Sequence, residues 1–226
     1  MAELVIVMGS TGSGKSYGIK YLDPKETIVI NVNSSKRLPW EGSSKSYNEE
    51  NINFFNLDTV PEIVTKLKQI SSHAKNVKNV IIDDIRYVME REYLKKALEQ
   101  GYTKYTVMGK NFQELIDAAI DMRNDIVVFL NFHDEDITSS STIIGKKIKL
   151  VGSLVEQHFN PLELVNIVLY AATEKTKDGV KHMLYTKAGS THNGHEIPSK
   201  SPEGLFSEDT IDNNFQLISD LIRNYY

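Results

Sequence analysis

Short apolar runs alternate with amphipathic segments along the first half of the chain. The apolar runs are rich in Val and Ile and predict buried strands at residues 3–8, 27–32, 53–57 and 79–82. The segments between them repeat apolar side chains at three- and four-residue spacing and predict helices at 17–22, 59–72, 85–100 and 111–123. Residues 33–51 are polar and rich in Ser, Gly and Pro, so they predict an exposed loop that carries the only tryptophan, Trp40.

The second half opens on the most continuous apolar run, residues 126–132, which predicts a strand buried on both faces. A polar loop is expected at 134–146, followed by strands at 147–151, 164–173 and 182–186, a short helix at 152–158 and a terminal helix at 211–225. The alternation of strands and helices predicts a three-layer α/β fold with a mainly parallel sheet. We expect one domain over residues 1–226, with the strands and helix of about 160–226 appended to the core.

Composition narrows the class of protein. Apolar residues make up 40% and charged residues 25% of the chain, which fits a soluble globular protein. No apolar stretch approaches the ~18 residues of a membrane span, and we expect no leader peptide, because the first strand runs straight into the glycine-rich turn. Cysteine is absent, which excludes disulfides and agrees with a cytoplasmic protein. The net charge of −4 gives no global attraction to nucleic acid, so such binding needs a local basic patch.

The first predicted strand leads directly into the sequence GSTGSGKS, followed by a predicted helix. This is the order of a phosphate-binding P-loop, in which backbone N–H groups surround phosphate oxygens. Lys15 is expected to reach the β- and γ-phosphates and Ser16 to bind Mg²⁺. The alternative is a Gly/Ser-rich turn that matches by chance. The expected nucleotide-binding residues are Gly9, Ser10, Thr11, Gly12, Ser13, Gly14, Lys15, Ser16 and Tyr17.

Two carboxylates follow the fourth predicted strand. An apolar strand that ends in Asp, downstream of a P-loop, is the Walker B pattern, and it assigns Asp83 to the Mg²⁺ ion. Asp84 is then the candidate that orients or deprotonates the attacking water. The alternative is that Asp84 caps the following helix, since Asp is common at helix N-termini.

His133 stands at the end of the longest apolar run. At that place a polar side chain can contact the γ-phosphate and relay its loss to the loop that follows, 134–146. The alternative is a hydrogen-bonded structural histidine. A metal site at residues 133–136 is disfavoured, because no second histidine lies at a supporting spacing.

Two segments interleave lysines with aromatic or hydroxyl side chains, as single-strand binding surfaces do. They lie at 93–110 and 138–149, and a third basic pair is Lys36 and Arg37. The alternative is a solvated face with lysines lying along it, and for either of the two segments taken alone this explanation is the better one.

With these motifs in place the chain resembles the phage-encoded RecA-like AAA ATPases, which include the Sak-type single-strand annealing recombinases. The segment Lys36-Arg37-Leu38-Pro39-Trp40 is similar to a loop of that family, and Lys200-Ser201-Pro202 to its C-terminal signature. The resemblance implies an ATP-dependent protein that works on single-stranded DNA in phage recombination or replication. It also implies self-association as a ring or filament in the cytoplasm of an infected host, with a single-strand binding protein as a further partner.

The resemblance makes two statements about single residues. In a ring or filament, Lys200 could reach the γ-phosphate held by a neighbouring subunit. RecA-like proteins usually carry a catalytic glutamate after the second strand, but here that strand ends Asn31-Val32-Asn33-Ser34. Either Asp84 takes over this role or hydrolysis is slow.

Two other functions stay open. A nucleotide-gated helicase loader or recombination mediator, acting through protein contacts, fits the acidic net charge equally well. A small-molecule P-loop kinase is disfavoured, because such kinases close an arginine-bearing lid over the phosphates. The chain has five arginines, and none lies in residues 134–146. No sequence feature separates ATP from GTP.

Overall fold

The computed structural model describes residues 1–226 except 34–35, 153–154, 156–158 and 178. Its strands are β1 (Glu3–Gly9), β2 (Thr27–Asn31), β3 (Phe54–Asn56), β4 (Asn79–Asp83), β5 (Val127–Ser139), β6 (Thr142–Ile148), β7 (Ile167–Thr176), β8 (Gly179–Tyr185), β9 (Thr191–His192), β10 (His195–Glu196) and β11 (Thr210–Asp212). Its helices are η1 (Lys15–Tyr21), α1 (Ser43–Ser46), α2 (Val60–His73), α3 (Arg86–Lys95), α4 (Thr103–Ile120), η2 (Pro161–Glu163) and α6 (Phe215–Tyr225). Within these residues no helix has the length and apolar character needed to cross a membrane.

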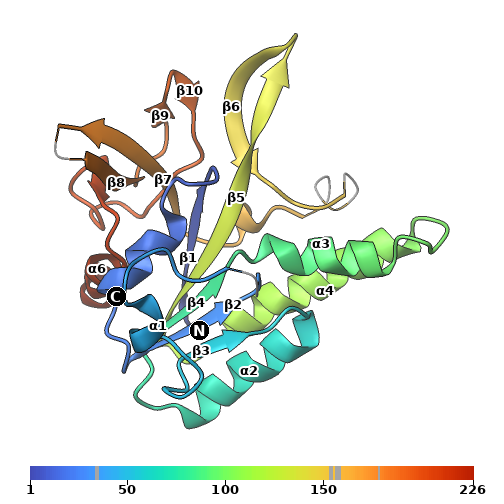
Figure 1. The fold of residues 1–226 in the computed structure, drawn as a ribbon. Helices are drawn as coiled ribbons and strands as arrows, with labels where there is room; N and C mark the ends of the chain where they lie inside the picture. Colours follow the sequence, from blue (N-terminus) through green and yellow to red (C-terminus); the bar gives the residue numbers. More distant parts are fainter. Residues whose placement is uncertain (34–35, 153–154, 156–158, 178) are drawn as a thin grey trace.

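The central sheet has the strand order β11-β8-β7-β1-β5-β4-β2-β3 (Figure 1). All neighbours from β7 to β3 are parallel, and β8 and β11 add antiparallel strands at one edge. The register aligns Gly9 of β1 with His133 of β5, and Asn31 of β2 with Asp83 of β4. The carboxyl ends of these strands therefore meet at one edge, where ligands bind in open α/β sheets.

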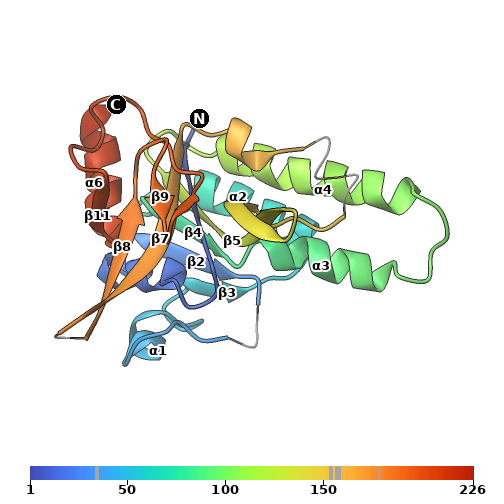
Figure 2. The ribbon, with the colours of Figure 1, turned by 90° about the horizontal axis from the view of Figure 1, so that it is seen from above.

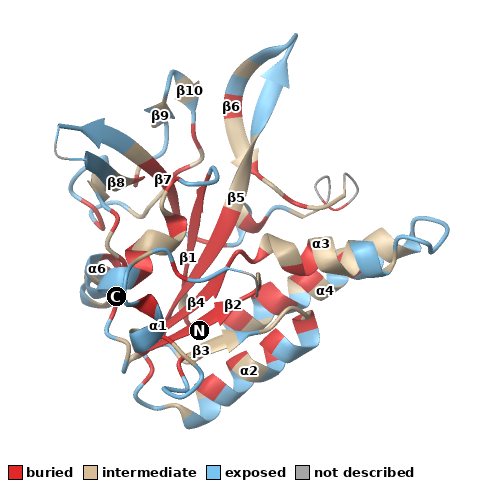
Figure 3. Ribbon diagram, in the orientation of Figure 1, coloured by how far each residue is buried: buried red, intermediate tan, exposed pale blue. Residues whose placement is uncertain are grey.

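Helices cover both faces of this sheet, which confirms the predicted three-layer α/β fold. On one face α2, α3 and α4 pack against side chains such as Ile6, Ile82 and Leu130. On the other face η1, α6 and the loop after β2 pack against the alternate side chains of the same strands, such as Val7 and Phe129. Figure 2 shows the two sets of helices on opposite sides, and Figure 3 shows the strands buried between them.

The C-terminal helix α6 packs directly against η1. A side chain at Gly18 would put its Cβ 2.3 Å from Asn213 Oδ1 and 2.4 Å from Phe215 Cδ1, so the approach requires glycine. Phe215 also stacks on Phe129 of β5, with ring centroids 4.5 Å apart. The end of the chain thus holds the helix that follows the P-loop.

Residues 134–146 were expected to be a polar loop, and this is wrong. They form most of a hairpin of β5 and β6 that projects from the sheet edge (Figure 1). Its base is held by cross-strand ion pairs, Asp136 to Lys146 and Glu135 to Lys147. The run of Ser and Thr that suggested a loop lies at the tip, where Ser140 and Ser141 turn the chain with positive φ.

Several other boundaries differ from the prediction. Helix α4 begins at Thr103 rather than near 111, and α3 ends at Lys95 rather than near 100. Residues 210–212 form strand β11, so the terminal helix begins at Phe215. The loop 33–51 is not wholly exposed, because it contains α1 and buries Leu38 and Tyr47. The helix expected at 152–158 lies largely outside the described residues.

Candidate nucleotide-binding site

The P-loop connects the end of β1 to the start of η1 and folds around the side chain of Lys15. The Lys15 ammonium is buried and donates to the carbonyl oxygens of Gly9, at 2.7 Å, and Ser10, at 2.9 Å. Burial lowers the pKa of Lys15, and the nearby carboxylates of Asp84, Asp134 and Asp83 oppose this shift. The cation therefore lies inside the loop that is expected to surround phosphate.

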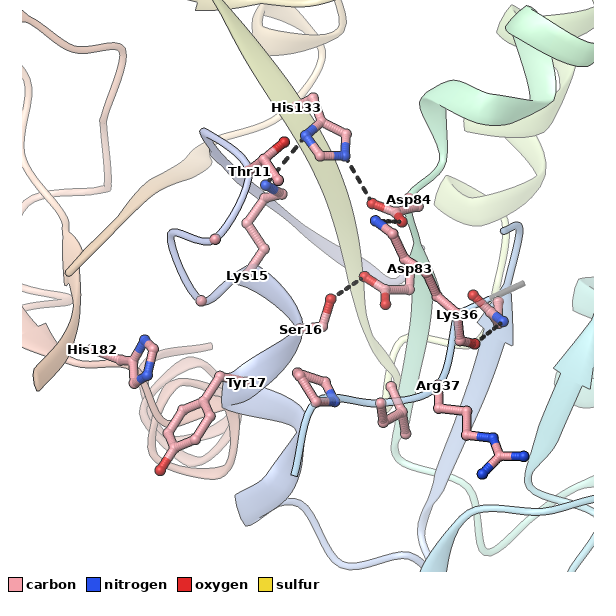
Figure 4. A pocket seen from close by; sticks show the side chains of 15 residues that line it. Thr11, Lys15, Ser16, Tyr17, Lys36, Arg37, Asp83, Asp84, His133 and His182 are labelled. Atoms are coloured by element: carbon pink, nitrogen blue, oxygen red, sulfur yellow. Dashed lines mark hydrogen bonds and ion pairs between the residues drawn. The ribbon is translucent and has the colours of Figure 1, made fainter. Parts of the chain in front are cut away.

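One side of the P-loop is packed by residues from the C-terminal part of the chain. Gly14 has a left-handed φ of +94°, and a Cβ there would lie 2.4 Å from His182 Nδ1. The ring of His182 stacks on Tyr17 with centroids 4.2 Å apart. Asn213 Nδ2 donates to the Gly14 carbonyl oxygen at 2.7 Å. Figure 4 shows Tyr17 and His182 on the side of the P-loop away from the two aspartates.

Ser16 and Asp83 meet at the position expected for a metal ion. Ser16 Oγ donates to Asp83 Oδ1 at 2.9 Å, and Asn131 Nδ2 from the neighbouring strand donates to the same oxygen at 2.8 Å. No hydrogen bond from the described residues reaches Asp83 Oδ2. Burial, and then the charge of Asp84, raises the pKa of Asp83, while the bonds from Asn131 and Ser16 oppose the rise.

This donor set fits Mg²⁺. The ion prefers oxygen ligands and usually takes one or two from protein, with the rest from phosphate and water. Ser16 and Asp83 would hold it, and it would neutralise charge on the phosphates. No group of three or more His, Cys, Asp or Glu side chains in the described residues is arranged to hold a metal ion alone.

Asp84 has an unusual backbone and two cationic or hydrogen-bonding partners. Its φ is +57°, a left-handed conformation that Asp adopts more readily than most residues. His133 Nε2 donates to Oδ1 at 3.0 Å, and Lys36 Nζ donates to Oδ2 at 2.9 Å. Burial would raise the pKa of Asp84, but these two hydrogen bonds bring the pKa to about 2. Ile85 is the N-cap of α3, which has no side-chain cap, so Asp84 does not cap that helix.

His133 links the P-loop to Asp84. Its Nδ1 lies 3.5 Å from Lys15 Nζ, and its Nε2 contacts Asp84. A neutral ring that carries its proton on Nε2 satisfies both contacts, because it accepts from lysine and donates to the carboxylate. The ring is therefore placed between the ammonium of Lys15 and the carboxylate of Asp84 (Figure 4).

These side chains border a cavity of about 370 Å³. The loop after β2 forms its other wall with Lys36, Arg37, Leu38 and Pro39. Figure 4 shows Arg37 directed away from the aspartates, whereas Lys36 points to them. Of the expected nucleotide-binding and metal-binding residues, Thr11, Gly12, Gly14, Lys15, Ser16, Tyr17 and Asp83 line this cavity, whereas Gly9, Ser10 and Ser13 do not.

A third carboxylate, Asp134, has a buried side chain and joins the P-loop to the hairpin. Its Oδ2 accepts from Ser10 Oγ at 3.0 Å and from the Tyr170 hydroxyl at 2.7 Å, and Lys146 Nζ lies 3.7 Å away. Burial, and then the bond to Asp134, raises the pKa of Tyr170. Asp134 therefore ties three separate segments together at the base of the hairpin.

We expect Asp134→Ala to lower the free energy of unfolding by about 2–3 kcal/mol, because it leaves the buried Tyr170 hydroxyl without its charged acceptor. The melting temperature should fall by roughly 4–10 °C in thermal unfolding. Asp136→Ala is the matched control, since Asp136 is 42% exposed and its ion pair is at the surface. Equal losses in the two variants would contradict the role given to Asp134.

Lys200 is not among the residues that line this cavity. Its backbone forms an isolated bridge with Val168 of β7, through hydrogen bonds of 2.8 and 2.9 Å. Val168 pairs with Ile6, which precedes the P-loop in β1. A contact of Lys200 with the nucleotide of a neighbouring subunit stays a prediction.

Most of the lysines and tyrosines expected to contact a polymer have partners inside the protein. Tyr93 and Tyr105 stack on each other, and Lys104 Nζ donates to the Glu99 carbonyl oxygen at 2.8 Å. Lys96 pairs with Glu92 at 2.7 Å. The exposed side chains of this segment include Leu94, Lys95, Leu98, Tyr102 and Lys110.

Sequence reasoning missed Asn131, Lys36 as the partner of Asp84, Asp134 and His182. Asn131 had a signal, because it is the polar residue inside an otherwise apolar run. His182 had none, since its contact with Gly14 spans most of the chain. Lys36 was noted for its charge and as part of the segment that resembles a loop of the phage ATPases, but not as a partner of Asp84.

Comparison with known families agrees with this geometry. The sequence profile of a family described as an AAA domain matches residues 2–196. Among solved structures the chain is similar to the KaiC-like protein PH0186 from the hyperthermophilic archaeon Pyrococcus horikoshii OT3. The sequence identity is 16%, the match covers 81% of this chain and 77% of the other, and the TM-score is 0.43. No curated protein matches in sequence. Since the profile match spans most of the sequence and includes the P-loop, Asp83 and His133, the chain belongs to the AAA-domain family of P-loop proteins.

Proposed function

We propose that the protein is a Mg²⁺-dependent ATPase that acts on single-stranded DNA in phage recombination or replication, as an oligomer with ATP between subunits. The observation that carries the hydrolysis part is the pair Asp83 and Asp84 beside the P-loop. The first carboxylate contacts Ser16 and the second contacts His133. The part concerning DNA and assembly is supported by the resemblance to the phage recombinases.

In the proposed reaction each residue of the site has a separate role. Lys15 binds the β- and γ-phosphates, and Ser16 and Asp83 hold Mg²⁺. Asp84 and His133 orient a water molecule toward the γ-phosphorus. The water oxygen forms a bond to phosphorus while the bond to the β-phosphate oxygen breaks, and ADP leaves with that electron pair. A carboxylate with a pKa of about 2 is a weak base, so the water proton passes to the released phosphate and Asp84 acts by position.

We expect Asp84→Asn to reduce turnover by roughly 10²-fold or more. A carboxylate has two oxygens that accept hydrogen bonds, from His133 and from water, whereas an amide has only one. Affinity for MgATP should change by less than about threefold, since Asp84 carries no phosphate or metal. Because the pKa of Asp84 is about 2 against 3.8 for a free Asp, the carboxylate stays ionised above pH 4. The wild-type pH profile should therefore show no loss from Asp84 between pH 5 and 9.

Steady-state turnover and nucleotide titration of the same preparations check this expectation. Asp121→Asn, on the exposed residue that ends α4, is the control and should behave as wild type. Unchanged turnover in Asp84→Asn would remove Asp84 from the mechanism.

Turnover with and without single-stranded DNA tests the DNA part. We expect stimulation by DNA, with an apparent affinity that falls as salt rises with a slope of about −0.7 per phosphate contacted. Sedimentation in the same buffers should show an oligomer. Unchanged turnover and no salt-dependent binding would reject the DNA substrate.

A second candidate is a nucleotide-gated adaptor that acts through protein contacts. Two observations favour it. Lys146 and Lys147 are engaged by carboxylates of the hairpin, which reduces their charge available to DNA. The tip of the α3–α4 pair exposes Leu94, Leu98 and Tyr102, which are 63%, 99% and 75% accessible. Nucleotide binding and turnover without any response to DNA would select the adaptor.

A further inference from the structure

Lys36 lies beside Asp84 in the cavity that the P-loop borders. Its ammonium is 2.9 Å from Asp84 Oδ2, and both residues line the cavity that the P-loop borders. Among the described residues of that cavity the lysines and arginines are Lys15, Lys36 and Arg37. Lys15 donates to the loop itself, and Arg37 points away from the aspartates (Figure 4). Lys36 is therefore the cation that faces the open part of the site beside the two carboxylates.

The two halves of this ion pair are held very differently. The Asp84 side chain is 6% exposed and is fixed by His133, whereas the Lys36 side chain is 51% exposed. The backbone of Lys36 is anchored, because its carbonyl oxygen accepts from Asn31 Nδ2 at 3.1 Å and its N–H donates to Asn33 at 2.9 Å. The buried Asn31, at the end of β2, thus anchors the backbone of Lys36, whose long side chain is half exposed.

The negative charges in the cavity favour a cation beside an incoming phosphate. Asp83 and Asp84 are adjacent buried carboxylates, and a γ-phosphate placed between them and the P-loop brings further negative charge. A cation shared between carboxylate and phosphate removes that repulsion, and ammonium groups bind phosphate oxygens through short charge-assisted hydrogen bonds. A diphosphate, which has no γ-phosphate, does not reach this position.

We propose that Lys36 binds the terminal phosphate of a nucleoside triphosphate and so makes the site prefer triphosphate to diphosphate. This inference rests on the proposed function, in which the cavity binds a nucleotide. With the site empty, its ammonium pairs with Asp84. With triphosphate present, it moves onto the γ-phosphate while staying near the carboxylate. Lys36 thereby supplies, from the same subunit, positive charge next to the reacting phosphate.

The test compares the affinities for a non-hydrolysable ATP analogue and for ADP, each with Mg²⁺, by titration calorimetry. We expect Lys36→Met to weaken binding of the analogue by roughly 10- to 100-fold, the value of one hydrogen bond to a charged group. Binding of ADP should change by less than about twofold. Lys36→Arg should keep most of the preference, and Lys45→Met, on an exposed lysine of α1, should keep all of it.

If Lys36→Met weakens the binding of the analogue and of ADP equally, or weakens neither, the proposal is overturned and Lys36 is only the structural partner of Asp84. Lys36→Gln is a milder variant that keeps a hydrogen-bond donor for Asp84, and its analogue-to-ADP ratio applies if the Met variant unfolds. Failure of the wild-type protein to bind either nucleotide would reject the proposed function as well. Normal wild-type binding with an unchanged ratio in the variants rejects only the role of Lys36.

Discussion

Lys15→Ala should abolish nucleotide turnover and weaken MgATP binding by more than about 100-fold, because it removes charge-assisted bonds to two phosphates. The ammonium lies inside the P-loop, bonded to the Gly9 and Ser10 carbonyl oxygens. On the proposed function the same group exchanges these carbonyl oxygens for phosphate oxygens. Since burial lowers the pKa of Lys15, a bound phosphate should raise that pKa again.

Fluorescent-nucleotide titration and phosphate release measure the two quantities. Lys25→Ala is the control, because Lys25 is an exposed lysine just after η1 and does not line the cavity. The Lys15→Ala variant should unfold within a few degrees of wild type, which separates loss of binding from loss of structure. Turnover that survives in Lys15→Ala would show that phosphate binds elsewhere.

The parts of the site that could be predicted are those at the ends of strands. Lys15, Ser16, Asp83 and His133 each follow an apolar run, and a parallel sheet brings the carboxyl ends of its strands to one edge. The pattern of apolar runs along the sequence therefore predicts that these residues lie together at one edge of the sheet. The order of the strands, with β5 between β1 and β4, then sets His133 beside both Lys15 and Asp84.

The parts that could not be predicted depend on contacts between distant segments. His182 packs on Gly14 because β8 returns beside the P-loop, and no local pattern encodes that approach. The sequence predicted a loop where β5 and β6 form a hairpin, because the Ser and Thr residues at its tip interrupt the alternation of apolar and polar side chains that is typical of strands. Its register places charges of opposite sign across from each other, such as Asp136 and Lys146. Charge alone suggested nucleic acid for Lys146, but the fold gives that lysine a carboxylate partner.

Asp83→Asn should reduce Mg²⁺-dependent turnover by roughly 10²-fold or more and, at the same time, stabilise the nucleotide-free protein. The loss follows because an amide is a far weaker Mg²⁺ ligand than a carboxylate. The gain follows because Asp83 and Asp84 are buried next to each other, so replacing one removes their repulsion. The carbonyl oxygen of the introduced amide can still accept from Ser16 and Asn131, so no hydrogen bond need be lost.

The predicted stabilisation by Asp83→Asn can be tested through the way it changes with pH. The pKa of Asp83 is raised on folding, so its ionised form costs stability above that pKa, and the cost disappears as pH falls through it. We therefore expect the variant to melt roughly 2–4 °C above wild type at pH 7.5, for about 1 kcal/mol, with the difference shrinking toward pH 4. Added MgATP should raise the melting temperature of wild type but not of the variant. Asp209→Asn, at an exposed carboxylate, is the control. A variant that melts below wild type at pH 7.5 would mean that the buried charge of Asp83 supports the empty site, and that Lys15 neutralises it more fully than the geometry implies.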